Sequence, residues 1–118
     1  MPRRDWRDRV ADIVDAAAAI RSHLAGLSED EFRASRLVSD AVERNFAVIG
    51  EAAAHIPDDL RDRHPEVPWS RMRRMRNFLV HVYFGVDHAT LWETAQQDLP
   101  PLIAALQAML AAEPTDEA

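Results

Sequence analysis

The chain has 118 residues, of which 47% are hydrophobic and 29% are charged, a balance typical of one globular domain with its own core. The absence of cysteine excludes disulfides and cysteine-based zinc sites, and no apolar run approaches the roughly 20 residues of a membrane span. The formal net charge of −6 argues against a general nucleic-acid binder, whose domain is usually basic. We expect a cytoplasmic protein, because the lack of cysteine fits a reducing compartment. The basic residues near the N-terminus are also not followed by the apolar segment of a signal peptide.

The first expected helix covers residues 6–24, where apolar residues recur at alternating four- and three-residue steps. This spacing is typical of a narrow buried seam in a helical bundle. Asp5 is placed to cap the start of the helix, and Gly26 follows its end in the usual stop position. Ser28 and Glu31 then match a capping box, which predicts a short helical turn over residues 29–34.

A second long helix is expected from about residue 35 to residue 56. Gly50 lies in its interior, where glycine costs up to about 1 kcal/mol relative to alanine, so it could mark a close approach of another helix. Asp40 and Glu43 lie outside the apolar stripe; they could orient site residues across the bundle, but we favour a surface role for both. The residues of the stripe are Val38, Val42, Phe46, Ile49, Ala53 and Ile56.

The second half of the chain predicts a loop with one helical turn at 58–64, a central helix from Pro68 or Ser70 to Gly85, and a last helix capped by Asp87. Pro100-Pro101 interrupts that last helix and predicts a kink or a restart. No useful period-2 alternation is present, so the expected fold is an all-α antiparallel bundle of four to five helices. It forms one domain over residues 1–112, with a frayed tail at 113–118.

The candidate functional side chains lie in residues 69–84, which contain four arginines, one histidine, the single tyrosine and no acidic residue. Met72, Met75, Leu79 and Val82 recur at helical spacing and predict that one face of this segment is buried. The arginines could form a positive patch on an acidic body, or they could pair with acids elsewhere in the bundle. Arg73 and Arg74, with Arg71, could steer RNA, but a solvated helix face explains them equally well.

Arg76 and His81 are five residues apart, about 140° around a regular helix, so their side chains could meet over one phosphate. A histidine can take a proton from a ribose 2′-hydroxyl, and an arginine can hold the scissile phosphate. The two would suffice for RNA cleavage without a metal, and His81 of a second copy could supply the second proton transfer. Spacing alone equally fits surface or interhelical hydrogen-bonding groups. The other histidines lack metal-ligand spacing, so we expect neither a metal nor a cofactor.

The segment Arg76-Asn-Phe-Leu-Val-His-Val-Tyr83 matches the R-x4-H-x-Y signature of the HepT-like toxins, which belong to the HEPN superfamily of small helical ribonucleases. The chain resembles this family over nearly its whole length, and the first helix contributes least. The supporting segments are Glu43 to Ala52, Pro68-Trp69, Met75-Arg76-Asn77, Tyr83 to Asp87, and Leu91-Trp92 through Asp98-Leu99-Pro100-Pro101.

The resemblance implies a type VII toxin–antitoxin pair in which a homodimeric toxin cleaves RNA in a cleft at the dimer interface. The implied antitoxin is MntA, a minimal nucleotidyltransferase that transfers AMP to the motif tyrosine. Carried over by position, Arg76 binds the phosphate, His81 is the general acid/base, Asn77 supports the site, and Tyr83 is the AMPylation target. Without the family, Tyr83 is best explained as an aromatic at the bundle surface with its hydroxyl in water.

An alternative function is a non-catalytic helical module that binds a nucleotidyltransferase or a nucleotide. In that case Arg76 would act only as a phosphate clamp. The seam of the first helix and the alanine-rich faces would suit packing against a partner.

Overall fold

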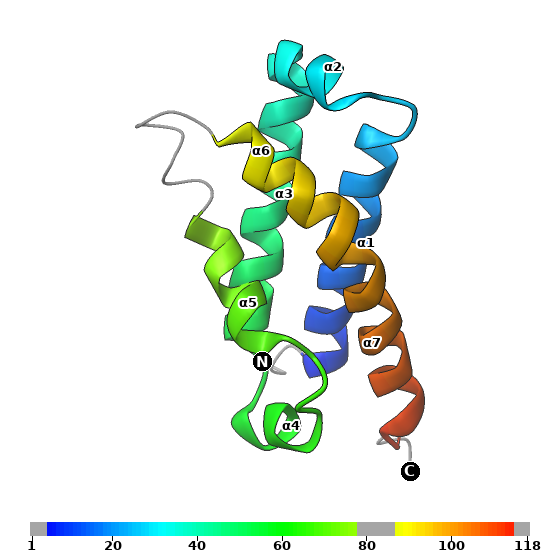
Figure 1. The fold of residues 1–118 in the computed structure, drawn as a ribbon. Helices are drawn as coiled ribbons and strands as arrows, with labels where there is room; N and C mark the ends of the chain where they lie inside the picture. Colours follow the sequence, from blue (N-terminus) through cyan, green and yellow to red (C-terminus); the bar gives the residue numbers. More distant parts are fainter. Residues whose placement is uncertain (1–4, 78–86, 115–118) are drawn as a thin grey trace.

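Two long antiparallel helices, α1 (Trp6–Leu24) and α3 (Arg36–Ala54), form the centre of the bundle (Figure 1). The computed structural model describes residues 5–77 and 87–114. The Asp5 side chain accepts a hydrogen bond from the backbone N–H of Arg7 and so caps α1, as the sequence predicts.

The short helix α2 (Glu29–Ala34) joins the two long helices at one end of the bundle. Its predicted capping box is confirmed: the Ser28 hydroxyl accepts from the Glu31 N–H, and the Glu31 carboxylate accepts from the Ser28 N–H. Gly26, in the loop before it, has a φ of 77°, the left-handed conformation that favours glycine.

The last part of the chain consists of α6 (His88–Glu93), a π-helical turn (Thr94–Asp98) and α7 (Leu99–Ala112). The predicted interruption is present, but it precedes the two prolines, which lie in the first turn of α7. Proline is tolerated there because the first amides of a helix have no partner within it. The path of the chain changes direction between α6 and α7, which lets α7 pack along α1 (Figure 1). The predicted cap of α6 is also confirmed, because Asp87 accepts from the Thr90 N–H.

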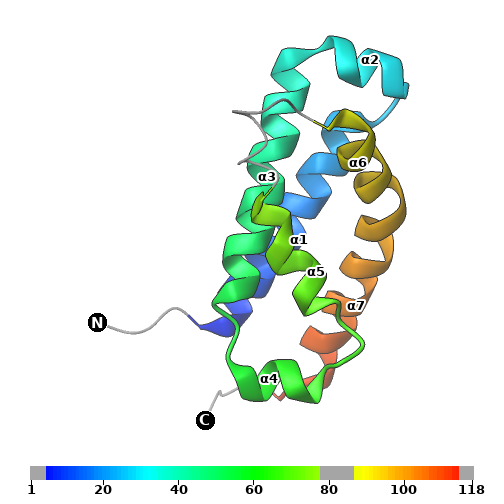
Figure 2. The same ribbon diagram turned by 60° about the vertical axis from the view of Figure 1, so that its left-hand side comes forward.

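Helix α4 (Asp58–Arg63) crosses the foot of the bundle and leads into α5 (Trp69–Arg74), which packs against α3 (Figure 2). The sequence predicts a single helix continuing from here to Gly85. The regular α-helix instead ends at Arg74, and residues 75–77 form a 3₁₀ turn. Such turns are common at helix ends, where an amide switches to a nearer carbonyl, as the Met75 N–H does to Met72. The predicted end at Gly85 lies outside the described residues.

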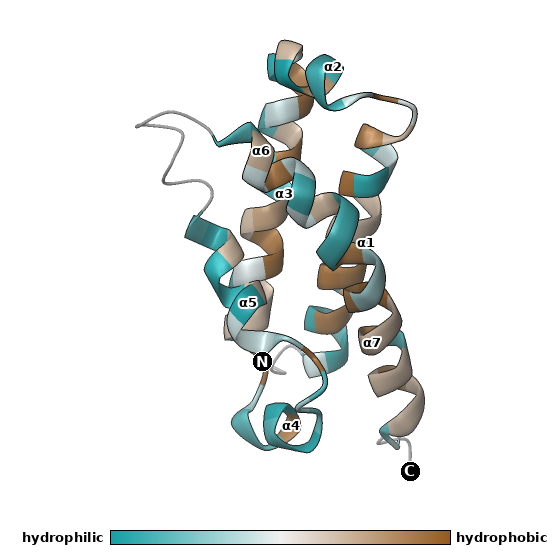
Figure 3. Ribbon diagram, viewed as in Figure 1, coloured by the Kyte–Doolittle hydropathy of each residue, from teal (hydrophilic) through white to brown (hydrophobic). Residues whose placement is uncertain are grey.

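The predicted apolar stripes of α1 and α3 are buried, although Trp6 and Val38 at their starts are only partly so. Figure 3 shows the apolar residues concentrated in α1, α3 and α7, whereas α2, α4 and α5 are largely polar. The all-α bundle is therefore confirmed. No helix among the described residues is long and apolar enough to cross a membrane.

A charged cluster ties the end of α7 to the loop before α5. The Glu113 carboxylate accepts a 2.6 Å hydrogen bond from His64 Nε2 and a 2.8 Å hydrogen bond from Arg63. The carbonyl of His64 in turn accepts a 2.9 Å hydrogen bond from the Trp69 indole, so the cluster helps to set where α5 begins. The domain boundary at residue 112 stays a prediction; α7 ends at Ala112, and residues 115–118 lie outside the described part.

This cluster should make stability depend on pH in a defined direction. Hydrogen bonds from Arg63 and His64 lower the pKa of Glu113 from 4.5 to about 2, and the bond to Glu113 raises the pKa of His64 above 6.5. The Glu113 contribution is therefore present above pH 4.5 and lost as the pH falls towards 2. The His64 contribution is present below pH 6.5 and lost as the pH rises through its raised pKa.

We therefore expect Glu113→Gln to lower the free energy of unfolding most between pH 4.5 and 6.5, where both partners are charged. Urea unfolding of the wild type and the variant across pH 3–9 measures the difference. Asp59→Asn, which removes a more exposed partner of Arg63, is the control and should show no such window. A difference between wild type and Glu113→Gln that does not vary with pH would contradict the assignment.

Candidate functional site

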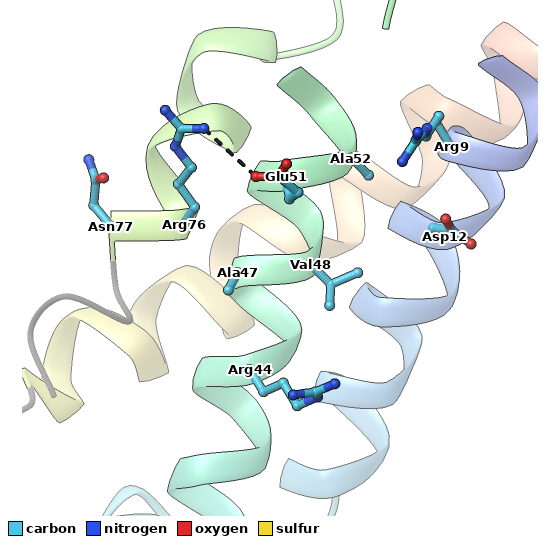
Figure 4. A pocket seen from close by; sticks show the side chains of 9 residues that line it. All are labelled: Arg9, Asp12, Arg44, Ala47, Val48, Glu51, Ala52, Arg76 and Asn77. Carbon is cyan, nitrogen blue, oxygen red and sulfur yellow. Dashed lines mark ion pairs between the residues drawn. The ribbon is translucent and has the colours of Figure 1, made fainter. Parts of the chain in front are cut away.

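Arg76 and Asn77 lie in the 3₁₀ turn that follows α5, and both side chains are exposed. Met72 and Met75 anchor the turn in the core. They are 0% and 2% exposed, as their helical spacing predicts. The buried methionines fix the turn on α3 while the polar side chains remain open to a ligand. Figure 4 shows Arg76 and Asn77 beside α3, on the flank away from α1.

Because Gly50 has no side chain, the backbone of α3 can pack directly against the backbone of this turn. A Cβ added at Gly50 would lie 2.6 Å from the backbone nitrogen of Arg76 and 2.8 Å from the Arg76 Cβ. Neither atom is the end of a flexible side chain, so the turn would have to move to accept any other residue. The predicted close approach at Gly50 is confirmed, and it places the backbone of Arg76.

Among the described residues, the Arg76 guanidinium has only a loose partner. Its Nη1 lies 3.8 Å from Glu51 Oε2, and the two side chains are 57% and 60% exposed. Exposed pairs of this kind contribute at most about 1 kcal/mol, so a phosphate could displace the carboxylate. The other oxygen of Glu51 lies 3.8 Å from His55 Nδ1.

A pocket of about 610 Å³ opens over α3, with α1 on one side and the turn of Arg76 on the other (Figure 4). Its centre is apolar, and its edges carry three guanidinium groups and two carboxylates, so the lining has one net positive charge on a chain of net charge −6. The lining residues are Arg9 and Asp12 of α1, Arg44, Ala47, Val48, Glu51 and Ala52 of α3, and Arg76 and Asn77 of the turn.

His81 and Tyr83 lie outside the described residues, so the predicted meeting of Arg76 and His81 over one phosphate stays a prediction. Arg73 and Arg74 are exposed on α5 and do not line the pocket. Pairing with acids, one of the two alternatives for the arginines of this segment, is found for two of them, and the positive patch stays a prediction. Arg71 pairs with Asp98 at 3.2 Å and Arg76 with Glu51, whereas neither Arg73 nor Arg74 forms an ion pair within the described part of the chain.

Glu43 is not a surface residue, contrary to the sequence-based expectation. Its side chain is only 2% exposed, and it lies 3.4 Å from the Ser39 hydroxyl, which also contacts His88 Nε2 at 3.2 Å. Burial, and then the charge of Asp40, raises the pKa of the Glu43 carboxyl. The group belongs to a buried polar cluster that joins α3 to the start of α6. Asp40 is exposed, as expected.

Two pocket residues, Arg9 and Arg44, were not among the sequence-based candidates. A signal existed in α3, where residues 44, 47, 48 and 51 are spaced as one helical stripe beside the buried one. Arg9 could not be found this way, because its place at the pocket depends on how α1 packs against α3. Within the described ranges, no group of three or more histidine or acidic side chains could hold a metal ion.

Residues 13–109 match a family model described as ribonuclease HepT-like. The chain belongs to the HepT-like ribonuclease family. A relative from Thermococcus cleftensis, named probable ribonuclease HepT, is 39% identical over 100 residues, which cover 85% of this chain and 91% of the relative. Two proteins of Methanocaldococcus jannaschii, named as candidate RNases, are each 37% identical over 102 residues, or 86% of this chain and 84% and 88% of their own lengths. No solved structure matches the chain.

In this HepT-like chain, Gly50→Ala tests whether the backbone approach positions the site. Alanine normally stabilises a helix interior by up to about 1 kcal/mol relative to glycine. Here the contact with Arg76 should reverse the sign and cost about 1–3 kcal/mol. Urea unfolding measures the change, and Ala47→Gly, three residues earlier on α3, reports the ordinary preference for alanine. A more stable Gly50→Ala variant would show that the turn can move freely.

Proposed function

We propose that this chain is a metal-independent endoribonuclease that serves as the toxin of a cytoplasmic toxin–antitoxin pair. The match to the HepT-like family over residues 13–109 carries the proposal. The position of Arg76 supports it, because its guanidinium is exposed, has only a loose partner among the described residues, and lies at the edge of a nucleotide-sized pocket.

The proposed reaction is attack of a ribose 2′-oxygen on the adjacent phosphorus. His81 takes the proton of the 2′-hydroxyl, a bond forms from the 2′-oxygen to phosphorus, and the bond from phosphorus to the 5′-oxygen breaks. The products are a 2′,3′-cyclic phosphate and a 5′-hydroxyl, so the departing 5′-oxygen must receive a proton. Arg76 holds the phosphate and offsets the charge that develops on it, and Asn77 supports the site.

We further propose that the toxin acts as a homodimer. The reaction needs a general acid as well as a general base, and the signature supplies one histidine per chain. In a symmetric dimer, His81 of the second copy can donate the proton to the leaving oxygen. Arg73 and Arg74, which are exposed on α5, could attract the RNA before it binds.

Neutralisation is proposed to occur by AMPylation of Tyr83 by a minimal nucleotidyltransferase of the MntA type. Tyr83 follows His81 by two residues in the sequence. An adenylate attached there would bring a negatively charged phosphate into competition with the RNA for Arg76.

We expect His81→Ala to reduce RNA cleavage by about 10²–10⁴-fold, because it removes the general base. Arg76→Ala should reduce it by about 10²–10³-fold, because the developing charge loses its partner. Both effects are measured with a labelled RNA in EDTA, with thermal unfolding as the check that the variants fold. Arg36→Gln, an exposed change on α3 away from the pocket, is the matched control.

Cleavage by the wild type only after addition of a divalent metal would reject the proposed chemistry. Growth measurements separate the toxin from the non-catalytic module. Expression without the nucleotidyltransferase should arrest growth, and His81→Ala should relieve the arrest. Harmless expression, combined with loss of nucleotide or partner binding in Arg76→Ala, would favour the module.

Tyr83→Phe should remain able to cleave RNA but should resist neutralisation, because the phenol oxygen that accepts AMP is missing. Incubation with the nucleotidyltransferase and ATP, followed by mass spectrometry, measures the addition of AMP. The wild type should gain the adenylate and lose RNase activity, whereas the variant should show neither change. Equal modification of both proteins would assign the addition to another residue.

A further inference from the structure

Arg9 and Arg44 are two guanidinium groups of the pocket to which the proposed chemistry assigns no role. Neither forms an ion pair with any residue in the described ranges, whereas Arg7, Arg33, Arg63 and Arg71 each pair with a carboxylate. In Figure 4, Arg9 extends from α1 towards α3, and Arg44 extends from α3 towards α1. Two cations that form no ion pair among the described residues thus lie across α3 from Arg76, with Arg9 beside Ala52 at one end of the groove and Arg44 beyond Val48 at the other (Figure 4).

Between these cations and Arg76 lies an apolar surface formed by Ala47, Val48 and Ala52 of α3. Arg44 precedes Glu51, the partner of Arg76, by seven residues, or about 10 Å along the helix. The pocket volume of about 610 Å³ is within the range of sites that hold a nucleotide-sized ligand. Guanidinium groups thus flank a small apolar surface on both sides of α3.

An RNA strand has the matching chemistry, because its phosphates alternate with sugars and bases that have apolar faces. We propose that the pocket is an RNA subsite in which Arg44 and Arg9 each bind a separate phosphate that neighbours the scissile one at Arg76. The nucleotide between Arg76 and Arg44 lies over Ala47 and Val48. This inference rests on the proposed function in one respect, since the phosphate at Arg76 sets the register of the strand.

The subsite also explains how an acidic chain can bind RNA. Phosphate contacts supply most of the sequence-independent affinity for nucleic acid, and each one releases counterions. Arg9, Arg44 and Arg76 concentrate the positive charge in one pocket, although the whole chain carries a net charge of −6. Asp12 and Glu51 at the same edges limit the net positive charge of the pocket.

The test uses a 2′-O-methylated single-stranded oligonucleotide, which has phosphates but no 2′-hydroxyl and so cannot be cleaved by the proposed route. Fluorescence anisotropy measures its binding to the full chain at several salt concentrations. We expect Arg44→Gln and Arg9→Gln each to weaken binding by about 3- to 10-fold and to reduce the slope of affinity against salt by about 0.7. Arg36→Gln on α3 and Arg21→Gln on α1 make the same charge change outside the pocket and should alter neither quantity.

A methylated dinucleotide with a single phosphate gives a sharper comparison. It can reach Arg76 but has no flanking phosphate, so Arg44→Gln should leave its binding unchanged while Arg76→Gln weakens it. Equal losses for the short and the long probe would show that Arg44 acts through the scissile phosphate, and would overturn the subsite.

The remaining outcomes separate this inference from the proposed function. If the wild type does not cleave RNA but Arg44→Gln and Arg9→Gln still weaken binding of the methylated strand, the subsite holds and the proposed activity fails. If the wild type cleaves RNA and neither variant changes binding or salt dependence, the subsite is wrong. A change in sedimentation mass in Arg44→Gln would assign the pocket to an interface between protein chains, and undetectable wild-type binding would also reject it.

Discussion

The site depends on the backbone contact between α3 and the turn after α5. Gly50 is the only interior residue of α3 without a side chain, and it lies where the amide of Arg76 meets the helix. Met72 and Met75 fill the core below the turn, and the bond from Trp69 to the His64 carbonyl fixes where α5 begins. The backbone of Arg76 is thus packed against α3 and the core, whereas its guanidinium is exposed and has only a loose partner among the described residues.

The local charge of the pocket depends on which arginines have a carboxylate partner, and not on the net charge of the whole chain. Several of the described arginines pair with acids on the same or a neighbouring helix, as Arg33, Arg63 and Arg71 do. The pocket differs because Arg9 and Arg44 have no such partner among the described residues and Arg76 has a weak one. A net charge of −6 is therefore compatible with a local site for a polyanion.

The sequence predicts the features that depend on local chemistry. The caps at Asp5, Ser28 and Asp87, the buried stripes of the long helices and the approach at Gly50 all follow from short-range spacing, and the structure confirms them. Features that depend on how helices pack were missed. The burial of Glu43, the end of the regular helix at Arg74 and the pocket shared by α1 and α3 cannot be read from one helix at a time. His81 and Tyr83 lie outside the described residues, so only the Arg76 half of the signature can be compared with the structure.

The atoms nearest to a Cβ built at Gly50 are the amide nitrogen, Cα and Cβ of residue 76, which nearly every amino acid possesses. This contact therefore does not depend on which side chain residue 76 carries beyond its Cβ. Since the guanidinium is 57% exposed and its pair with Glu51 is long, the scaffold gains little from having arginine there. Among the described residues, the packing therefore does not select arginine at position 76, and its guanidinium is open to a ligand.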